Sequence, residues 1–95
     1  IVICSRPGGS CPAEDALLAA QNLLLASHAM GLGTCLVGFA VAAMRRDSSL
    51  QKFLGIPERE KVHAVVALGY PAVEYRRPAG RKKAVMRYFE LEGPA

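Results

Sequence analysis

The sequence lacks the signals that would assign it at once to a secreted, disulfide-bonded or repetitive class. Its 95 residues hold no basic stretch ahead of an apolar core and no C-terminal lipidation motif. The three cysteines, Cys4, Cys11 and Cys35, form no C-x-x-C pair, so neither a disulfide framework nor a metal site is indicated. No internal repeat is present. We therefore expect reduced thiols, packed as small buried apolar side chains, in a cytoplasmic protein.

Charged residues are absent from residues 16–44. A membrane span would explain such a stretch. Polar residues interrupt it, however, and Gly31 and Gly33 would break a helix where a bilayer leaves backbone groups unsatisfied. We therefore expect no transmembrane helix and no membrane partner. The interrupting residues are Gln21, Asn22, Ser27 and His28.

The first half of that uncharged stretch predicts a helix that ends near residue 30. Ser10 or Cys11 can cap it, Pro12 lies in its first turn, and Glu14 and Asp15 lie at the positive end of its dipole. Its polar residues fall on one narrow stripe, and nearly everything else is Leu, Ala or Met. A helix with so little polar surface is expected to be buried on almost all sides.

This chain has too few other elements to enclose such a helix. Its composition is 52% hydrophobic, which is high for a chain of this length. We expect the cover to come from another part of a longer chain or from a second subunit, with Leu18 and Leu25 buried there. Ile1 begins what reads as a strand already under way, so we expect a fragment or a processed piece.

The remaining chain predicts several shorter elements. An uncharged connection follows the helix, "GLGTCLVGF", in which Gly31 and Gly33 are expected to adopt the left-handed conformation. Residues 41–54 predict a helix in one or two pieces, with Asp47 as the second cap and Gly55 at the end. Residues 61–70, "KVHAVVALGY", predict a central strand buried on both faces. Residues 85–91 predict a short final strand.

Half of the twelve basic residues lie in the segment 76–87, which we call the basic tail segment. Such a cluster can be a solvated surface, a phosphate site for a small cofactor, or a contact with nucleic acid. No nucleic-acid-binding module is recognisable beside it. A ligand with a flat apolar ring and a phosphate would explain both the glycine-rich connection and this cluster. Its members are Arg76, Arg77, Arg81, Lys82, Lys83 and Arg87.

Three stretches in this order resemble the C-terminal half of the FMN-dependent nitroreductase family: "AAQNLLLASHAMGLGTC", "LGIPE" with "ALGYP", and the basic "RKK". The resemblance covers nearly the whole chain. It implies an α+β fold with an antiparallel sheet flanked by helices, an intertwined homodimer, and one FMN at each dimer-interface site. Residues 1–95 would then form only the C-terminal half of one domain, and the apolar helix would face the dimer partner.

The resemblance also implies the cofactor-binding residues. Backbone N–H groups near Leu36, Val37 and Gly38 would face the flavin N5 region, where they can stabilise charge that develops on reduction. Arg81 would reach the FMN phosphate, with Lys82 or Lys83 assisting. An Arg-x-Ser-x-Arg segment of the family's N-terminal half is missing here, so this chain is not expected to complete the site unaided.

No side chain is nominated as a catalytic acid or base, since the flavin carries the redox step. His28 and His63 are expected to be structural. The implied activity is reduction of FMN by NAD(P)H or another donor, followed by reoxidation by a nitroaromatic, quinone or similar small-molecule acceptor, with no part for nucleic acid. Two alternatives remain open: a non-enzymatic module whose basic tail binds nucleic acid or another polyanion, and an inactive fragment of the enzyme.

Overall fold

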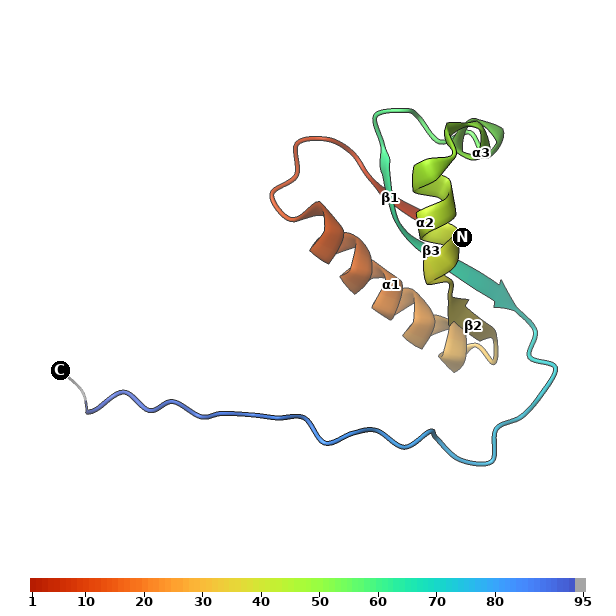
Figure 1. Cartoon of the computed structure of the whole chain (residues 1–95). Coiled ribbons are helices and arrows are strands. Elements are labelled where there is room, and N and C mark those ends of the chain that lie inside the picture. The colour runs from red at the N-terminus through yellow and green to blue at the C-terminus, as the bar shows by residue number, and fades with distance from the viewer. Residues whose placement is uncertain (94–95) are drawn as a thin grey trace.

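The computed structural model describes residues 1–93 (Figure 1). A short strand, β1 (Val2–Ser5), leads through a glycine-containing turn into the long helix α1 (Pro12–Ala29). A second strand, β2 (Gly33–Leu36), is followed at once by helices α2 (Gly38–Arg46) and α3 (Ser48–Phe53). The third strand, β3 (Lys61–Gly69), is the longest. The long helix and the long strand therefore lie where the sequence predicted them.

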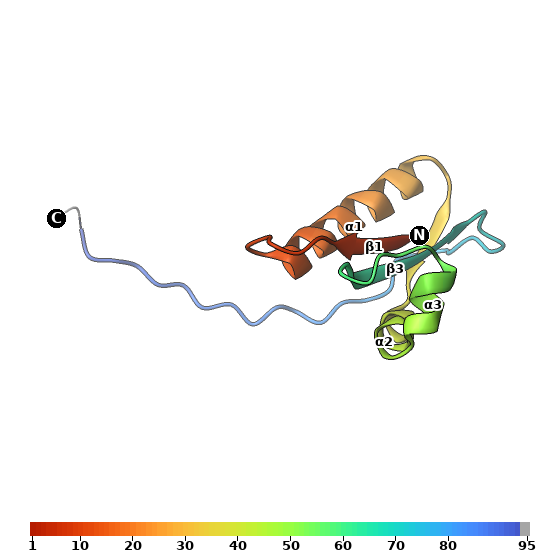
Figure 2. The same cartoon turned by 90° about the horizontal axis from the view of Figure 1, so that it is seen from above.

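The three strands form one antiparallel sheet in the order β1-β3-β2. Val2 pairs with Val65, and Leu36 pairs with Val66, so β3 is the central strand. Figure 2 shows α1 on one side of the sheet and α2 with α3 on the other. This arrangement confirms the expected α+β architecture of an antiparallel sheet flanked by helices.

The core is small and is centred on β3. Val62, Ala64 and Val66 alternate along the strand and are buried, together with Ala16 and Ala20 of α1. The side chains between them on β3 are only partly covered, and the last three residues of the strand are exposed. The expectation that both faces of this strand are buried is therefore wrong for this chain, because α2 is too short to cover the second face.

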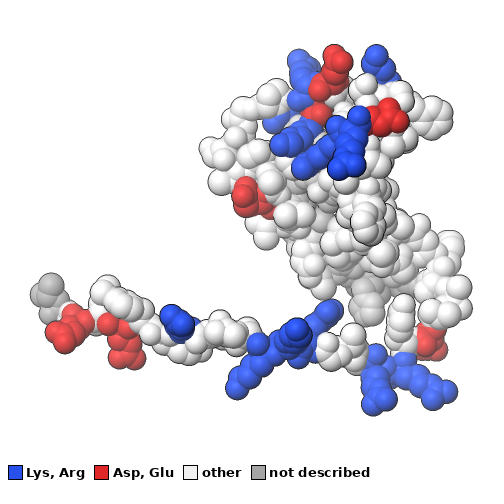
Figure 3. Space-filling view, in the orientation of Figure 1, with Lys and Arg blue, Asp and Glu red and all other residues white. Residues whose placement is uncertain are grey.

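Helix α1 exposes most of its apolar side chains. Only Ala16, Ala20 and Ser27 are buried along its length, and Figure 3 shows a surface almost free of charge over this helix. Leu18 is 67% exposed and Leu25 is 59% exposed in this chain, so their expected burial against another segment or subunit remains a prediction. The prediction that the chain cannot enclose the helix is confirmed by the same exposures.

The turns follow the sequence in most places. Gly31 and Gly55 adopt the left-handed conformation, with φ of +77° and +72°. Gly33 does not, because residues 33–36 pair with β3 as a strand rather than forming a connection. The expected break at Asp47 is confirmed. Its carboxylate accepts hydrogen bonds from the Ser49 hydroxyl and, at 3.0 Å, from the Ser49 N–H. The second bond caps α3, and the two together, the hydroxyl first, hold the pKa of Asp47 below its ordinary value.

Residues 70–93 contain no helix or strand. Residues 70–75 still lie beside β2, where they line a cavity with Gly33 and Cys35. The rest of the segment runs away from the folded body (Figures 1 and 2). The strand predicted over residues 85–91 is therefore wrong: Val85 is 93% exposed and Phe89 is 88% exposed. A strand needs a neighbour for its backbone hydrogen bonds, and no other described segment lies beside this one.

The cysteines are all free, as expected, but their burial differs from the prediction. Cys4 on β1 is half-buried, and its pKa is raised, first by burial and then by the nearby charge of Glu60. Cys11 and Cys35 are exposed. The assumption that each thiol fills a buried apolar position is thus wrong for these two.

Candidate functional site

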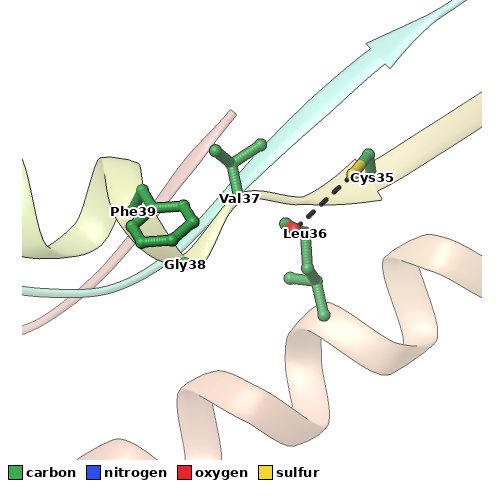
Figure 4. A pocket seen from close by; sticks show the side chains of 5 residues that line it. All are labelled: Cys35, Leu36, Val37, Gly38 and Phe39. Atoms are coloured by element: carbon green, nitrogen blue, oxygen red, sulfur yellow. Dashed lines mark hydrogen bonds between the residues drawn. The ribbon is translucent and has the colours of Figure 1, made fainter.

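The junction between β2 and α2 forms an open apolar cavity. Cys35, Leu36, Val37, Gly38 and Phe39 line it, and its volume is about 570 Å³ (Figure 4). The strand β2 is an edge strand, so this cavity opens at the margin of the sheet. Figure 4 shows Leu36 directed toward α1 and Val37 directed to the opposite side. The chain therefore brings three of the predicted cofactor-binding residues to one surface.

The backbone donors at this junction are not equivalent. The Val37 N–H donates to the Val65 carbonyl oxygen at 2.9 Å, so it is already occupied. By the alternation of an antiparallel ladder, the N–H of Leu36 points away from β3 toward the open edge. Val37 therefore offers a ligand its side chain, whereas Leu36 offers its N–H.

Further donors come from the first turn of α2. Gly38 is its first residue, and no side chain caps this end of the helix. The N–H groups of the first turn have no partner within a helix and carry the positive end of its dipole. This end of α2 can therefore receive hydrogen-bond acceptors or partial negative charge from a ligand in the cavity.

Gly38 leaves room for such a ligand. A Cβ atom built on it would meet nothing within 4 Å, and its φ is not in the left-handed region, so the fold of this chain does not require glycine there. Phe39 is 92% exposed and Leu36 is 48% exposed at the edges of the same cavity. A flat ring could lie against this backbone between two apolar side chains.

The predicted phosphate ligands lie elsewhere. Arg81, Lys82 and Lys83 are exposed on the extended tail, and within residues 1–93 none of them makes a hydrogen bond or an ion pair. This structure therefore does not bring the basic tail segment to the cavity. The predicted site is present here as two separate parts.

One cluster was missed by the sequence analysis. The His63 Nε2 atom lies 2.7 Å from Ser5 Oγ, and its Nδ1 atom lies 3.4 Å from a terminal nitrogen of Arg45. Arg45 also donates from Nε to the Val62 carbonyl oxygen at 3.0 Å. These bonds connect β1, β3 and α2. These contacts support the structural role expected for His63, but no local pattern relates it to Arg45, eighteen residues earlier.

Two absences apply to the described part of the chain. Residues 1–93 contain no group of three His, Cys, Asp or Glu side chains that could hold a metal ion. None of the helices described there is both long enough and apolar enough to cross a membrane. The apolar cavity and its backbone donors therefore stand as the candidate site.

Comparison with known proteins places these features in context. The model of the nitroreductase family matches residues 5–70. A protein of Archaeoglobus fulgidus, provisionally named NADH dehydrogenase/NAD(P)H nitroreductase, is 37% identical over 79 aligned residues. The match covers 78% of this chain and 45% of that protein. A protein of Methanothermobacter thermautotrophicus with the same name is 37% identical over 59 residues, 62% of this chain and 30% of that protein.

Among solved structures, the chain is similar to a nitroreductase from Bacteroides fragilis crystallised with bound FMN. The TM-score is 0.75 at 25% identity, and the match covers 94% of this chain and 49% of the other. The chain thus spans half or less of the length of these three proteins.

Proposed function

This chain belongs to the nitroreductase family, and we propose that its residues 1–95 form the C-terminal half of an FMN-dependent oxidoreductase domain. The family and the nitroreductase-like fold inferred from the sequence are both confirmed. The FMN in the Bacteroides fragilis structure supports a flavin cofactor here as well. The observation that carries the proposal is the uncapped N-terminus of α2, which opens onto the apolar cavity lined by residues 35–39.

The residues of the cavity fit the ring of a flavin. Bound FMN would supply the redox chemistry, taking electrons from NAD(P)H or another donor and passing them to a nitroaromatic, quinone or similar acceptor. The N–H groups of Leu36 and Gly38 would stabilise the negative charge that develops on the ring. Leu36 and Phe39 would cover its edges and exclude water. Gly38 would let the backbone approach closely.

The phosphate would be held by Arg81, with Lys82 or Lys83 assisting. For this the tail must fold back toward the cavity or toward the same cavity of a second subunit, since in this chain it extends into solvent (Figure 1). The exposed apolar face of α1 supports an assembly that covers it, which we propose to be a homodimer. On this account residues 1–95 alone are inactive, because the Arg-x-Ser-x-Arg segment that the family resemblance implies for the site is missing from them.

A second candidate function rests on one observation. The basic tail segment is exposed and unpaired with any described carboxylate, as a segment that binds nucleic acid or another polyanion would be. The aromatic residues Tyr75 and Tyr88 flank it. In that case its six basic residues would contribute to binding almost equally, and binding would weaken steeply with salt.

Titration of FMN into the full-length apoprotein separates the two functions. We expect Arg81→Ala to weaken FMN binding by about thirty- to a hundredfold, which corresponds to about 2–3 kcal/mol for a charge-assisted pair with phosphate. Arg76→Ala and Arg87→Ala are the matched controls and should change the affinity far less. Equal affinity in all three variants would remove the phosphate site from the account. A loss confined to Arg81→Ala would leave the polyanion function without support.

A further inference from the structure

A second cavity adjoins the candidate site on the same strand. It lies between β2, the end of β3 and the chain that follows β3, and residues 33–35, 67–73 and 75 line it. We call this cavity the tail groove. Its volume is about 410 Å³, which is large enough for a small ligand. Cys35 lines both the tail groove and the cavity at residues 35–39, so the two are continuous along β2.

The floor of the tail groove is formed by the sheet. Gly33 pairs with Gly69, and Cys35 pairs with Ala67. Paired residues and residues two apart share one face of a sheet, so these four lie on the same face. Cys35, Ala67 and Gly69 are exposed there. The floor is therefore an uncovered part of the sheet on which a planar ring can lie.

The wall of the tail groove comes from the chain after β3, which turns around the end of β2 (Figure 1). Pro71 lies directly against the strand, because a Cβ atom built on Gly33 would be 3.5 Å from the Pro71 Cβ atom. Val73 and Tyr75 follow in the same wall, and both side chains are exposed. A tyrosine beside an apolar cavity offers its ring for stacking against a second ring.

Positive charge lies next to this tyrosine. Arg76 and Arg77 follow Tyr75 directly, and among residues 1–93 neither forms an ion pair with a carboxylate. Glu74 is the single acidic residue among residues 70–77, so this stretch keeps a net positive charge. Figure 3 shows basic side chains gathered where the tail leaves the apolar body. Arginine binds phosphate through paired hydrogen bonds, so an aromatic base joined to phosphates fits this combination of groups.

We propose that the tail groove binds the adenosine diphosphate part of a dinucleotide electron donor, with the adenine against Tyr75 and the phosphates on Arg76 and Arg77. The identity of the donor as NAD(P)H rests on the proposed flavin function, whereas the binding of the nucleotide does not. A dinucleotide carries its reacting ring at one end and its adenine at the other. Because Cys35 borders both cavities, a donor whose reacting ring meets the flavin at residues 35–39 can extend along β2 into the groove.

Calorimetric titration of ADP-ribose into the full-length protein without FMN tests the nucleotide site. ADP-ribose contains the adenosine diphosphate group but no nicotinamide. We expect it to bind, and we expect Tyr75→Ala to weaken binding about tenfold because a base loses its stacking partner. Tyr75→Phe keeps the ring and should bind ADP-ribose as the unsubstituted protein does. Absence of binding, or an equal affinity in Tyr75→Ala, would overturn the proposal.

Matched controls come from the same tail. Arg76→Ala and Arg77→Ala should each weaken ADP-ribose binding about tenfold, since each loses a charge-assisted hydrogen bond to phosphate. Tyr88→Ala and Arg87→Ala alter exposed residues of the same types outside the groove and should leave the affinity unchanged. An equal loss in Arg87→Ala would overturn the proposal. So would a single-stranded oligothymidylate that binds more tightly than ADP-ribose and weakens steeply with salt, which indicates a polyanion site.

Steady-state kinetics of the full-length protein loaded with FMN test the role in donor binding. Tyr75→Ala should raise the KM for NADH about tenfold and leave kcat unchanged, because the stacked adenine takes no part in the reaction. The KM for reduced nicotinamide mononucleotide, which lacks the adenosine, should stay the same. An equal rise for both donors would overturn the role in donor binding. If ADP-ribose binds as expected while no variant binds FMN, the proposed function fails and the nucleotide site stands.

Discussion

Cys35 is the side chain whose reactivity reports most directly on the cavity between β2 and α2. It is exposed and lines that cavity, whereas Cys11 is exposed at the start of α1, away from it. Both thiols should react quickly with a small thiol reagent at about pH 8. Saturation with FMN should then slow the labelling of Cys35 and leave that of Cys11 unchanged, as measured by mass spectrometry of peptides. Equal labelling of Cys35 with and without FMN would contradict the proposed location of the ring.

The labelling rate of Cys4 is expected to depend on pH differently from that of the other two cysteines. Because burial and the charge of Glu60 raise its pKa, less of this thiol is ionised at a given pH than of an ordinary cysteine. Its labelling should therefore be the slowest of the three and should rise only at higher pH.

For single residues, the sequence correctly predicted the features that depend only on residues close by in the chain. The left-handed turns at Gly31 and Gly55 and the cap at Asp47 require only local backbone chemistry, and all three are present. Gly33, Cys11 and Cys35 were misjudged, because strand pairing and solvent exposure depend on distant parts of the chain. The sequence also could not show that the Val37 N–H is already hydrogen-bonded, since its acceptor, the Val65 carbonyl oxygen, lies far away in the chain.

Among the elements, α3 depends most clearly on a single side chain. It is six residues long and has no buried residue, and Asp47 caps it through the Ser49 N–H. Asp47→Ala should fray α3, whereas Asp47→Asn keeps an acceptor and should preserve more of it. The Ser49 amide chemical shift in NMR spectra reports the cap. An unchanged shift in Asp47→Ala would contradict this role.

The pH dependence of this cap has a definite sign. The folded state lowers the pKa of Asp47, so the stabilisation is complete above the ordinary carboxyl pKa of 3.8 and is lost as the pH falls through the lower folded value. The Ser49 amide shift should therefore remain constant down to about pH 4 and change only below it.

Long elements were more predictable than edge strands. The long helix α1 and the central strand β3 carry their own patterns over eighteen and nine residues. The strand β2 has only four residues, and its identity comes from pairing with β3. The strand expected over residues 85–91 has a suitable composition but no neighbouring strand in the described chain. Composition indicates that a segment can be a strand, and pairing decides whether it is one.

The whole molecule leaves a large apolar surface uncovered on α1 (Figure 3). If a homodimer covers it, replacing Leu18 and Leu25 with Gln should weaken dimerisation by about tenfold or more per side chain, since burial of a leucine contributes about 1.5–3 kcal/mol. Sedimentation of the full-length protein measures this. Lys52→Ala, at an exposed position of α3 on the other side of the sheet, is the control. An unchanged dissociation constant in the leucine variant would contradict the proposed interface.

The sequence predicted the part of the candidate site at residues 36–38, but it did not predict where the basic residues of the tail lie. The sequence led to residues 36–38, and the structure assembles them at the start of α2. The basic residues at 81–83 lie apart from them in this chain, because nothing in residues 1–93 folds the tail back.

The central claim is that the flavin ring lies against the backbone at the start of α2, and FMN titration of Gly38→Val tests it most directly. A valine side chain here meets open space within this chain, so the fold should be retained. FMN affinity should nevertheless fall about tenfold or more, because the branched side chain would occupy the position of the ring. Cys35→Ser, at the same cavity, should bind FMN nearly as the unsubstituted protein does. Undiminished FMN binding by a folded Gly38→Val protein would contradict the account.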